Sequence, residues 1–183
     1  MTPAERLCGP LDQIMVHERA QPMLDYEGEL AFVIGRDAKN VKEEDALDFV
    51  LGYTIANDVS ARNLVTMEVA FNQMGHSKSF DTFGPIGPCI ASTKLIEDPH
   101  RLRLVTRVNG EIRQDSHTSD MIWTIKQLLA WASENRTIKC GTVIMTGTPS
   151  GVGWHSDGLL KDGDIIEVEI ENIGSIVNKV VFI

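Results

Sequence analysis

Three carboxylates stand at the ends of two apolar segments in this 183-residue chain. Glu27 and Glu29 flank a glycine just before an apolar run, and Asp58 closes the apolar segment 53–58. Side chains two residues apart in a strand project from the same face, so the two glutamates are expected side by side. Burying such a pair is costly unless a cation joins it. Ligands of this kind suit Mg²⁺ or Mn²⁺, and also Ca²⁺, rather than zinc.

The same carboxylates also fit an ordinary structural role. On spacing alone, Glu27 and Glu29 are read as solvated residues at the start of a strand, and Asp58 as the N-cap of a following helix. Two basic residues, Lys78 and Arg62, are candidates for binding a substrate beside such a metal. Lys78 lies in a short polar and aromatic segment, and Arg62 follows Asp58 by one predicted helical turn. Either is usually a surface charge, but next to a metal it could bind a substrate carboxylate or stabilise an enolate.

The glycine-rich loop 147–153 excludes two familiar types of active site. Thr148 stands where a nucleophile elbow would need a glycine before Ser150, and the loop has no lysine for a phosphate-binding motif. We expect a tight turn that presents backbone amides and the Thr148 hydroxyl to an anion. The five histidines show no metal-ligand spacing.

Strand patterns dominate the chain. They cover five stretches, at 29–35, 51–56, 101–114 with a type I′ turn at Asn109 and Gly110, 142–146, and a hairpin over 164–183. Helical patterns cover three, at 42–50, 60–72 and 121–132, the last capped by Thr118 or Ser119. We therefore predict a β-rich α+β fold, with an irregular segment at 1–23 and a metal-binding catalytic domain at 24–183.

Composition excludes several partners. The net charge of −9 repels nucleic acid and anionic membranes, and no apolar run approaches the ~20 residues of a membrane helix. The N-terminus does not read as a signal peptide. The three cysteines are widely spaced, which favours reduced packing residues over a disulfide framework. We expect a cytoplasmic protein, with an organelle such as the mitochondrion as the alternative.

Five segments in order resemble the fumarylacetoacetate hydrolase family, in its C-terminal catalytic domain. They are 24–36, 57–62, 78–85, 108–114 and 146–153. The resemblance implies a mixed β-roll, usually a homodimer. It also implies chelation of a small anionic 2-oxo acid by Mg²⁺ or Mn²⁺, followed by an enolate. Members cleave diketo acids such as acylpyruvates, decarboxylate oxaloacetate, or isomerise hydroxymuconate-like acids.

Roles for individual residues follow from this resemblance. Glu27, Glu29 and Asp58 match the metal ligands. Arg62, Lys78 and Thr148 match positions that contact substrate, and Lys78 would act catalytically by adding positive charge where the enolate develops.

The chain departs from the family pattern at three points. The upstream segment with a water-activating His and Glu, under a lid, is missing; Val65 replaces a frequent Gln; and 71–77 lacks a frequent Trp. We therefore expect an intact metal platform whose usual general base is either missing or supplied from elsewhere. Three hypotheses follow: a hydrolase that cleaves a C–C bond in a diketo acid, a decarboxylase or isomerase on the same platform, or a non-catalytic paralogue.

Overall fold

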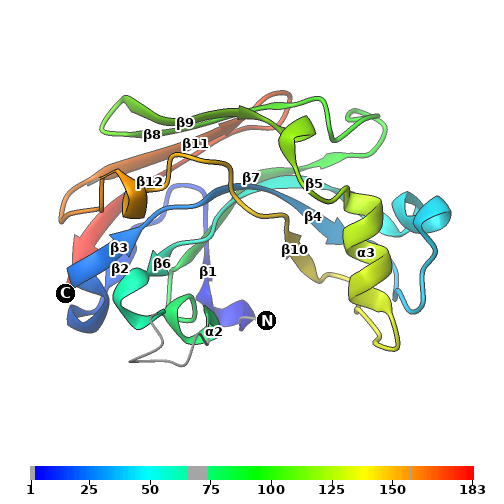
Figure 1. Ribbon diagram of the computed structural model, residues 1–183, viewed down its shortest axis with the longest axis horizontal. Helices are drawn as coiled ribbons and strands as arrows, with labels where there is room; N and C mark the ends of the chain where they lie inside the picture. Colours follow the sequence, from blue (N-terminus) through cyan, green and yellow to red (C-terminus); the bar gives the residue numbers. More distant parts are fainter. Residues whose placement is uncertain (1–2, 66–73, 157) are drawn as a thin grey trace.

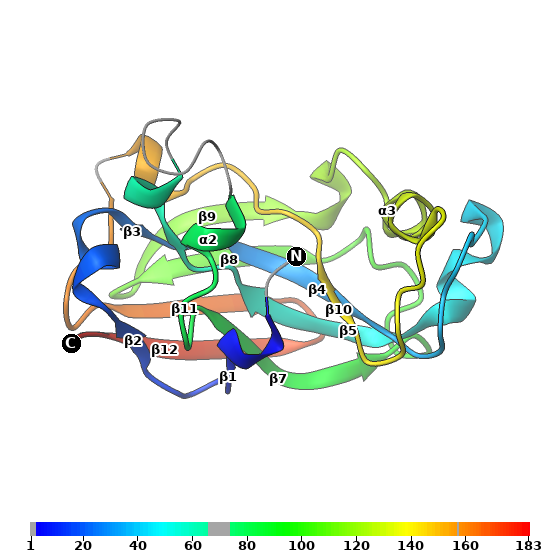
Figure 2. The same cartoon turned by 90° about the horizontal axis from the view of Figure 1, so that it is seen from below.

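Two five-stranded β-sheets pack face to face in the computed structural model (Figures 1 and 2), which describes residues 3–65, 74–156 and 158–183. The first sheet has the order β1 (Leu7–Cys8), β7 (Gly84–Ser92), β5 (Val50–Asn57), β4 (Gly28–Ile34) and β10 (Val143–Met145). The second has the order β2 (Ile14–Val16), β12 (Gly174–Phe182), β11 (Ile165–Ile170), β8 (Arg103–Val108) and β9 (Glu111–His117). A third sheet pairs β3 (Leu24–Asp25) with β6 (Ser60–Ala61).

Strand β4 forms the centre of the core. Every one of its residues is buried, which agrees with the continuous apolar run in the sequence. It pairs antiparallel with β5 on one side and β10 on the other. The predicted strands at 29–35, 51–56 and 142–146 are therefore confirmed as three neighbours in one sheet.

Both predicted hairpins are also confirmed. Asn109 and Gly110 adopt φ values of 53° and 82° between β8 and β9, as a type I′ turn requires. Leu102, Leu104, Thr106 and Val108 are all buried, so the alternating face points into the core as expected. Strands β11 and β12 form the second hairpin, in which the whole of β11 pairs with 174–179 of β12.

Several strands, among them the nine-residue strand β7, were not predicted from the sequence. Strand β7 is rich in glycine and proline, which are depleted in strands, yet it pairs with both β5 and β1. The segment 1–23, predicted as irregular, contributes β1 and β2 as parallel edge strands, together with the 3₁₀ turns η1 (Ala4–Arg6) and η2 (Glu18–Met23). Strands of two or three residues are too short to show a periodicity. The domain boundary at residue 24 stays a prediction.

The helix predictions need correction. Helix α3 (Ile125–Ser133) begins after Thr124, not at Met121, and the predicted caps instead lie in the 3₁₀ turn η5 (Thr118–Asp120). Thr124 and Gln127 form a capping box, and this local pair overrides the apolar periodicity upstream. Ile122 is accordingly 88% exposed.

Two other segments predicted as α-helices form different, shorter elements in the structure. Segment 42–50 is the 3₁₀ helix η3 (Glu43–Phe49), and the predicted helix at 60–72 starts as strand β6 followed by the 3₁₀ turn η4 (Arg62–Leu64). Its remainder, at 66–72, lies outside the described residues. A further α-helix among the described residues, α2 (Met74–Ser77), is a single turn that precedes Lys78.

Two remaining sequence expectations can also be compared with the structure. None of the helices in the described residues is long and apolar enough to span a membrane. The cysteines are free, but Cys89 and Cys140 are exposed, so only Cys8 is partly buried as a packing residue would be.

The capping box gives a first testable prediction. Thr124→Ala should lower the free energy of unfolding by about 1 kcal/mol, because the amide of Gln127 loses its side-chain acceptor. Urea denaturation measures the change. Lys126→Ala, at an exposed position of the same helix, is the control and should leave stability within about 0.5 kcal/mol. Equal stability of the Thr124 variant and wild type would show that the box does not hold the helix start.

Candidate metal centre

The three predicted carboxylates converge in the structure. Each of Glu27, Glu29 and Asp58 offers an oxygen, and these oxygens all lie within 4.8 Å of one another. Glu27 is 8% exposed and Glu29 is 3% exposed, so the reading as solvated residues at a strand start is wrong for both. Their convergence follows from the β4–β5 pairing, where Gly28 lies opposite Asn57 and the amide of Asp58 donates to the carbonyl of Glu27 at 2.9 Å.

Glu29, unlike Glu27 and Asp58, forms no ion pair with a basic side chain among the described residues. Its Oε2 accepts a hydrogen bond of 2.6 Å from the amide of Gly147. Burial, and then the charge of Asp58, raise the pKa of Glu29 to about 8 in spite of that hydrogen bond. A divalent cation would remove this penalty by stabilising the carboxylate form.

Lys78 bridges the other two carboxylates. Its Nζ donates to Glu27 Oε2 at 2.6 Å and also to Asp58 Oδ2. Burial lowers the pKa of Lys78, but the charges of Asp58 and Glu27 and the hydrogen bonds to them outweigh burial and raise it. The predicted cation of the site is therefore placed between two predicted metal ligands, and it stays protonated.

Arg62 also reaches the centre, but not by the route expected. Its Nε donates to Asp25 at 2.9 Å and its Nη2 to Glu27 at 2.6 Å, so it joins two carboxylates instead of making one bidentate pair. The helical spacing from Asp58 is wrong, because β6 intervenes. Asp25 itself is fully buried and accepts further hydrogen bonds from the amides of Gly153 and Trp154.

Arg6 is a residue of the centre that the sequence analysis missed. Its Nη2 lies 2.8 Å from Asp58 Oδ1, and its Nη1 donates to the carbonyls of Lys78 and Phe83. The side chain is 2% exposed. No local pattern distinguishes this arginine in the sequence, because only the pairing of β1 with β7 carries it to the site.

The Thr148 hydroxyl is engaged within the protein. It donates to the carbonyl of Gly28 at 2.9 Å and accepts from Gln114 Nε2 at 2.8 Å. The amide of Gly147 donates to the side chain of Glu29, so binding of an external anion by this loop stays a prediction. Contact of Thr148 with a substrate stays a prediction.

The residues present fit a hard divalent cation. Their donors are carboxylate oxygens, which Mg²⁺ and Mn²⁺ prefer, and Asp58 Oδ1 is buried without a hydrogen-bond partner among the described residues. That oxygen does lie at ion-pair distance from Arg6, but the donor geometry is poor. Glu27, Glu29 and Asp58 would hold the cation.

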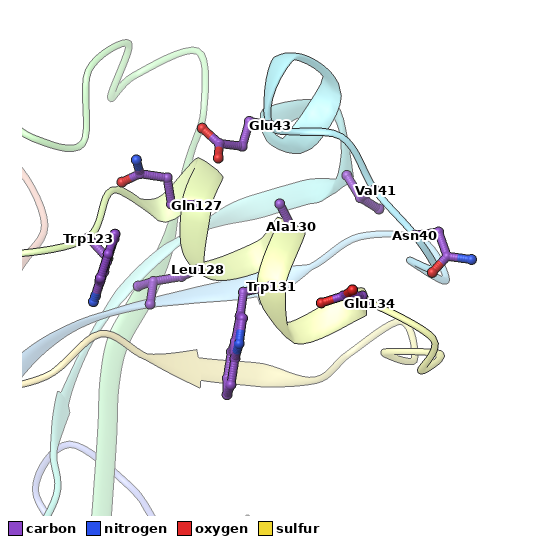
Figure 3. Close-up of a pocket in the computed structure, with 9 residues that line it drawn as sticks. All are labelled: Asn40, Val41, Glu43, Trp123, Gln127, Leu128, Ala130, Trp131 and Glu134. Atoms are coloured by element: carbon purple, nitrogen blue, oxygen red, sulfur yellow. The ribbon is translucent and has the colours of Figure 1, made fainter.

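Two pockets can be compared with the position of these carboxylates. One, of about 740 Å³, opens between α3 and η3 and is flanked by Trp123 and Trp131 (Figure 3). The other, of about 390 Å³, includes Thr148 and His117. Neither has Glu27, Glu29 or Asp58 in its lining, but the smaller one reaches Gly147, whose amide donates to Glu29.

The fold and the centre together define a class of protein: a β-rich α+β domain with mixed sheets and a cluster of buried carboxylates suited to a divalent metal. The sequence model for the C-terminal region of fumarylacetoacetate (FAA) hydrolase matches residues 1–181. The chain therefore belongs to the fumarylacetoacetate hydrolase family, and the predicted fold type is confirmed.

Several relatives have names that describe isomerisation. A mitochondrial oxaloacetate tautomerase from Xenopus laevis is 46% identical over 97% of this chain and 56% of its own length. The oxaloacetate tautomerase YisK from Bacillus subtilis is 43% identical over 92% of this chain and 56% of its own length. This chain thus spans just over half of either relative.

A solved structure shows the same architecture. It is described as a 5-carboxymethyl-2-hydroxymuconate delta-isomerase from Mycobacterium smegmatis and superposes with a TM-score of 0.90 at 41% identity. The superposition covers 100% of this chain and 68% of that one.

The raised pKa of Glu29 predicts opposite effects of one substitution on stability and metal binding. In metal-free protein Glu29→Gln should raise stability by about 1 kcal/mol at pH 8, because it removes a buried charge and keeps the acceptor for Gly147. A pKa raised to about 8 means that folding favours the protonated acid, so wild-type stability falls as pH rises from about 4.5 to 8.

Urea denaturation in chelator at pH 5 and pH 8 tests this prediction. The advantage of the variant should be small at pH 5 and larger at pH 8. Adding Mn²⁺ should stabilise wild type and leave Glu29→Gln unchanged. A variant that is less stable than wild type at pH 8 would contradict our account of Glu29.

Proposed function

We propose that this chain forms a divalent-metal centre that interconverts the keto and enol forms of a small 2-oxo acid, with oxaloacetate as the first candidate. The observation that carries the proposal is the convergence of Glu27, Glu29 and Asp58 with Lys78 at one point. The names of the relatives support tautomerisation or isomerisation better than the C–C hydrolysis that we placed first from the sequence.

The charges of the centre support an anionic substrate. Three buried carboxylates, Asp25, Glu27 and Glu29, and the partly buried Asp58 face three cations, Arg6, Arg62 and Lys78. With Glu29 protonated, as its pKa of about 8 indicates at neutral pH, these charges cancel. A divalent cation that displaces the Glu29 proton leaves one net positive charge, so binding of an acid should depend on metal.

The residues match the needs of tautomerisation. A bound Mg²⁺ or Mn²⁺ would supply Lewis-acid polarisation of the oxo group. Lys78 is protonated in the resting centre, so in the enol-to-keto direction it would donate its proton to carbon and would be restored by the proton that leaves the enol hydroxyl. The keto-to-enol direction would run the same two transfers backward, and the positive charge of Lys78 would favour the enolate. Arg62 supplies a second cation for a substrate carboxylate. Moving a proton between carbon and oxygen consumes no water.

The binding part of this proposal is tested by calorimetry. Wild-type protein should bind Mn²⁺ and Mg²⁺, and should bind oxalate, which mimics a dianionic enolate, only in their presence. Glu29→Ala should lose both. If the wild-type protein binds neither metal nor oxalate, the carboxylates have no metal-binding role. That result would favour the hypothesis of a non-catalytic paralogue.

The catalytic part is tested by the ultraviolet decay of enol-oxaloacetate with Mn²⁺ and with chelator. Lys78→Met should lower kcat about 100-fold, as removal of one electrostatic donor typically does. Lys126→Met, at an exposed position on α3, is the matched control and should retain wild-type activity. Parallel assays separate the alternatives. Release of CO₂ from oxaloacetate without enol decay would favour a decarboxylase, and release of pyruvate from acylpyruvates without enol decay would favour a hydrolase.

We also propose that the protein is a homodimer, as the family resemblance implies. Light scattering on the purified chain tests this, and a monomer at micromolar concentration would contradict it.

A further inference from the structure

Gln114 connects the second sheet to the metal centre through a fully buried amide. It lies on β9 and is 1% exposed. Its Oε1 accepts from the amide of Gly28 at 3.2 Å, and its Nε2 donates to Thr148 Oγ1 at 2.8 Å and to the carbonyl of Pro149 at 3.0 Å. The Gln114 side chain is thus hydrogen-bonded both to the start of β4, beside Glu27 and Glu29, and to the loop that contains Thr148.

The direction of each hydrogen bond in this group is fixed by chemistry. A backbone carbonyl can only accept, so Pro149 identifies the Gln114 nitrogen, and the amide of Gly28 can only donate, so it identifies the oxygen. The carbonyl of Gly28 likewise fixes the Thr148 hydroxyl as a donor at 2.9 Å. The Thr148 hydroxyl oxygen has two lone pairs. One accepts from Gln114 Nε2, and the other can still accept a hydrogen bond.

These bonds close a ring around the residue between two predicted ligands. Gly28 separates Glu27 from Glu29, and both its amide and its carbonyl are held, the first by Gln114 and the second by Thr148. A Cβ on Gly28 would lie 2.2 Å from Thr106 Oγ1, so the strand approaches the second sheet as closely as a glycine allows. The same loop binds Glu29 through the amide of Gly147.

We propose that Gln114 is a positioning residue of the metal centre. It fixes the two peptide groups from which Glu27 and Glu29 project, and it sets the Thr148 hydroxyl as an acceptor toward any ligand. An acceptor suits the hydroxyl of an enol better than the oxygen of a keto group. This inference deepens the proposed function and rests on it, because it requires that the carboxylates bind a divalent cation.

The test is metal affinity, which does not depend on turnover. Gln114→Met keeps the side-chain length and removes all three hydrogen bonds. The Kd for Mn²⁺ by calorimetry should rise 10- to 100-fold, the range typical when a group that orients metal ligands is lost. The electron paramagnetic resonance spectrum of bound Mn²⁺ should also change, because the ligand geometry is altered.

Asn178→Leu is the matched control. Asn178 is an equally buried amide in the same sheet, 1% exposed, and it donates to the carbonyls of Gly9 and Asp12 rather than to the site. Its loss should destabilise the protein and leave the Kd for Mn²⁺ within about twofold of wild type. A similar loss of affinity in both variants would mean a general structural effect and overturn the inference.

A second variant covers the case in which Gln114→Met does not fold. Thr148→Val breaks the ring at Gly28 and is nearly isosteric, so it should also weaken Mn²⁺ binding. If both variants fold, the double variant should bind Mn²⁺ about as weakly as the weaker single one, because both act through one ring. If the losses of Mn²⁺-binding free energy in the two single variants add up in the double variant, the hydrogen-bonded ring is not the cause of the weaker binding.

Failure of the inference is distinguishable from failure of the proposed function. If wild type binds Mn²⁺ and the Gln114 and Thr148 variants bind it equally well, the metal centre stands and the positioning role falls. If wild type itself binds no divalent metal, the proposed function falls and this inference falls with it.

Discussion

The repulsion between buried carboxylates is the constraint around which the rest of this structure is arranged. Glu27 and Glu29 project from the start of the most buried strand, and Asp58 joins them from the next strand. Such a cluster is tolerated only if cations compensate it. Arg6, Arg62 and Lys78 do so from three separate parts of the chain, and the short strands and turns that seem peripheral in the fold are the elements that deliver them.

Much of the fold and part of the centre could be predicted from the sequence. The apolar run of β4 and the turn at Asn109 and Gly110 are local signals, and both were interpreted correctly. The triad was proposed from i, i+2 spacing and strand ends, and its three carboxylates do meet. Arg6 could not be found in this way, because its proximity to Asp58 depends on a two-residue parallel strand with no periodicity of its own.

Two of the wrong predictions share a physical origin. Helix α3 starts at Thr124 because a reciprocal pair of side-chain hydrogen bonds outweighs the apolar pattern upstream. Arg62 was placed by helical geometry, whereas the chain stays extended through β6 and the guanidinium turns to Asp25. In both cases a specific polar contact decided the outcome, and such contacts are invisible to a reading based on hydrophobic periodicity.

The hydrogen-bond inventory shows how a cation can bind without dismantling this arrangement. Each carboxylate offers about four lone-pair sites, whereas Lys78 and Arg62 use only one on each oxygen of Glu27. In the part of the chain that the structure describes, Glu29 uses a single oxygen, for Gly147, which leaves its other oxygen for a cation. A divalent cation can therefore share Glu27 and Asp58 with the protein's own cations and take Glu29 as its main charge partner. Lys78 contacts both Glu27 and Asp58, so under the proposed function its charge would lie beside the cation and the oxo acid.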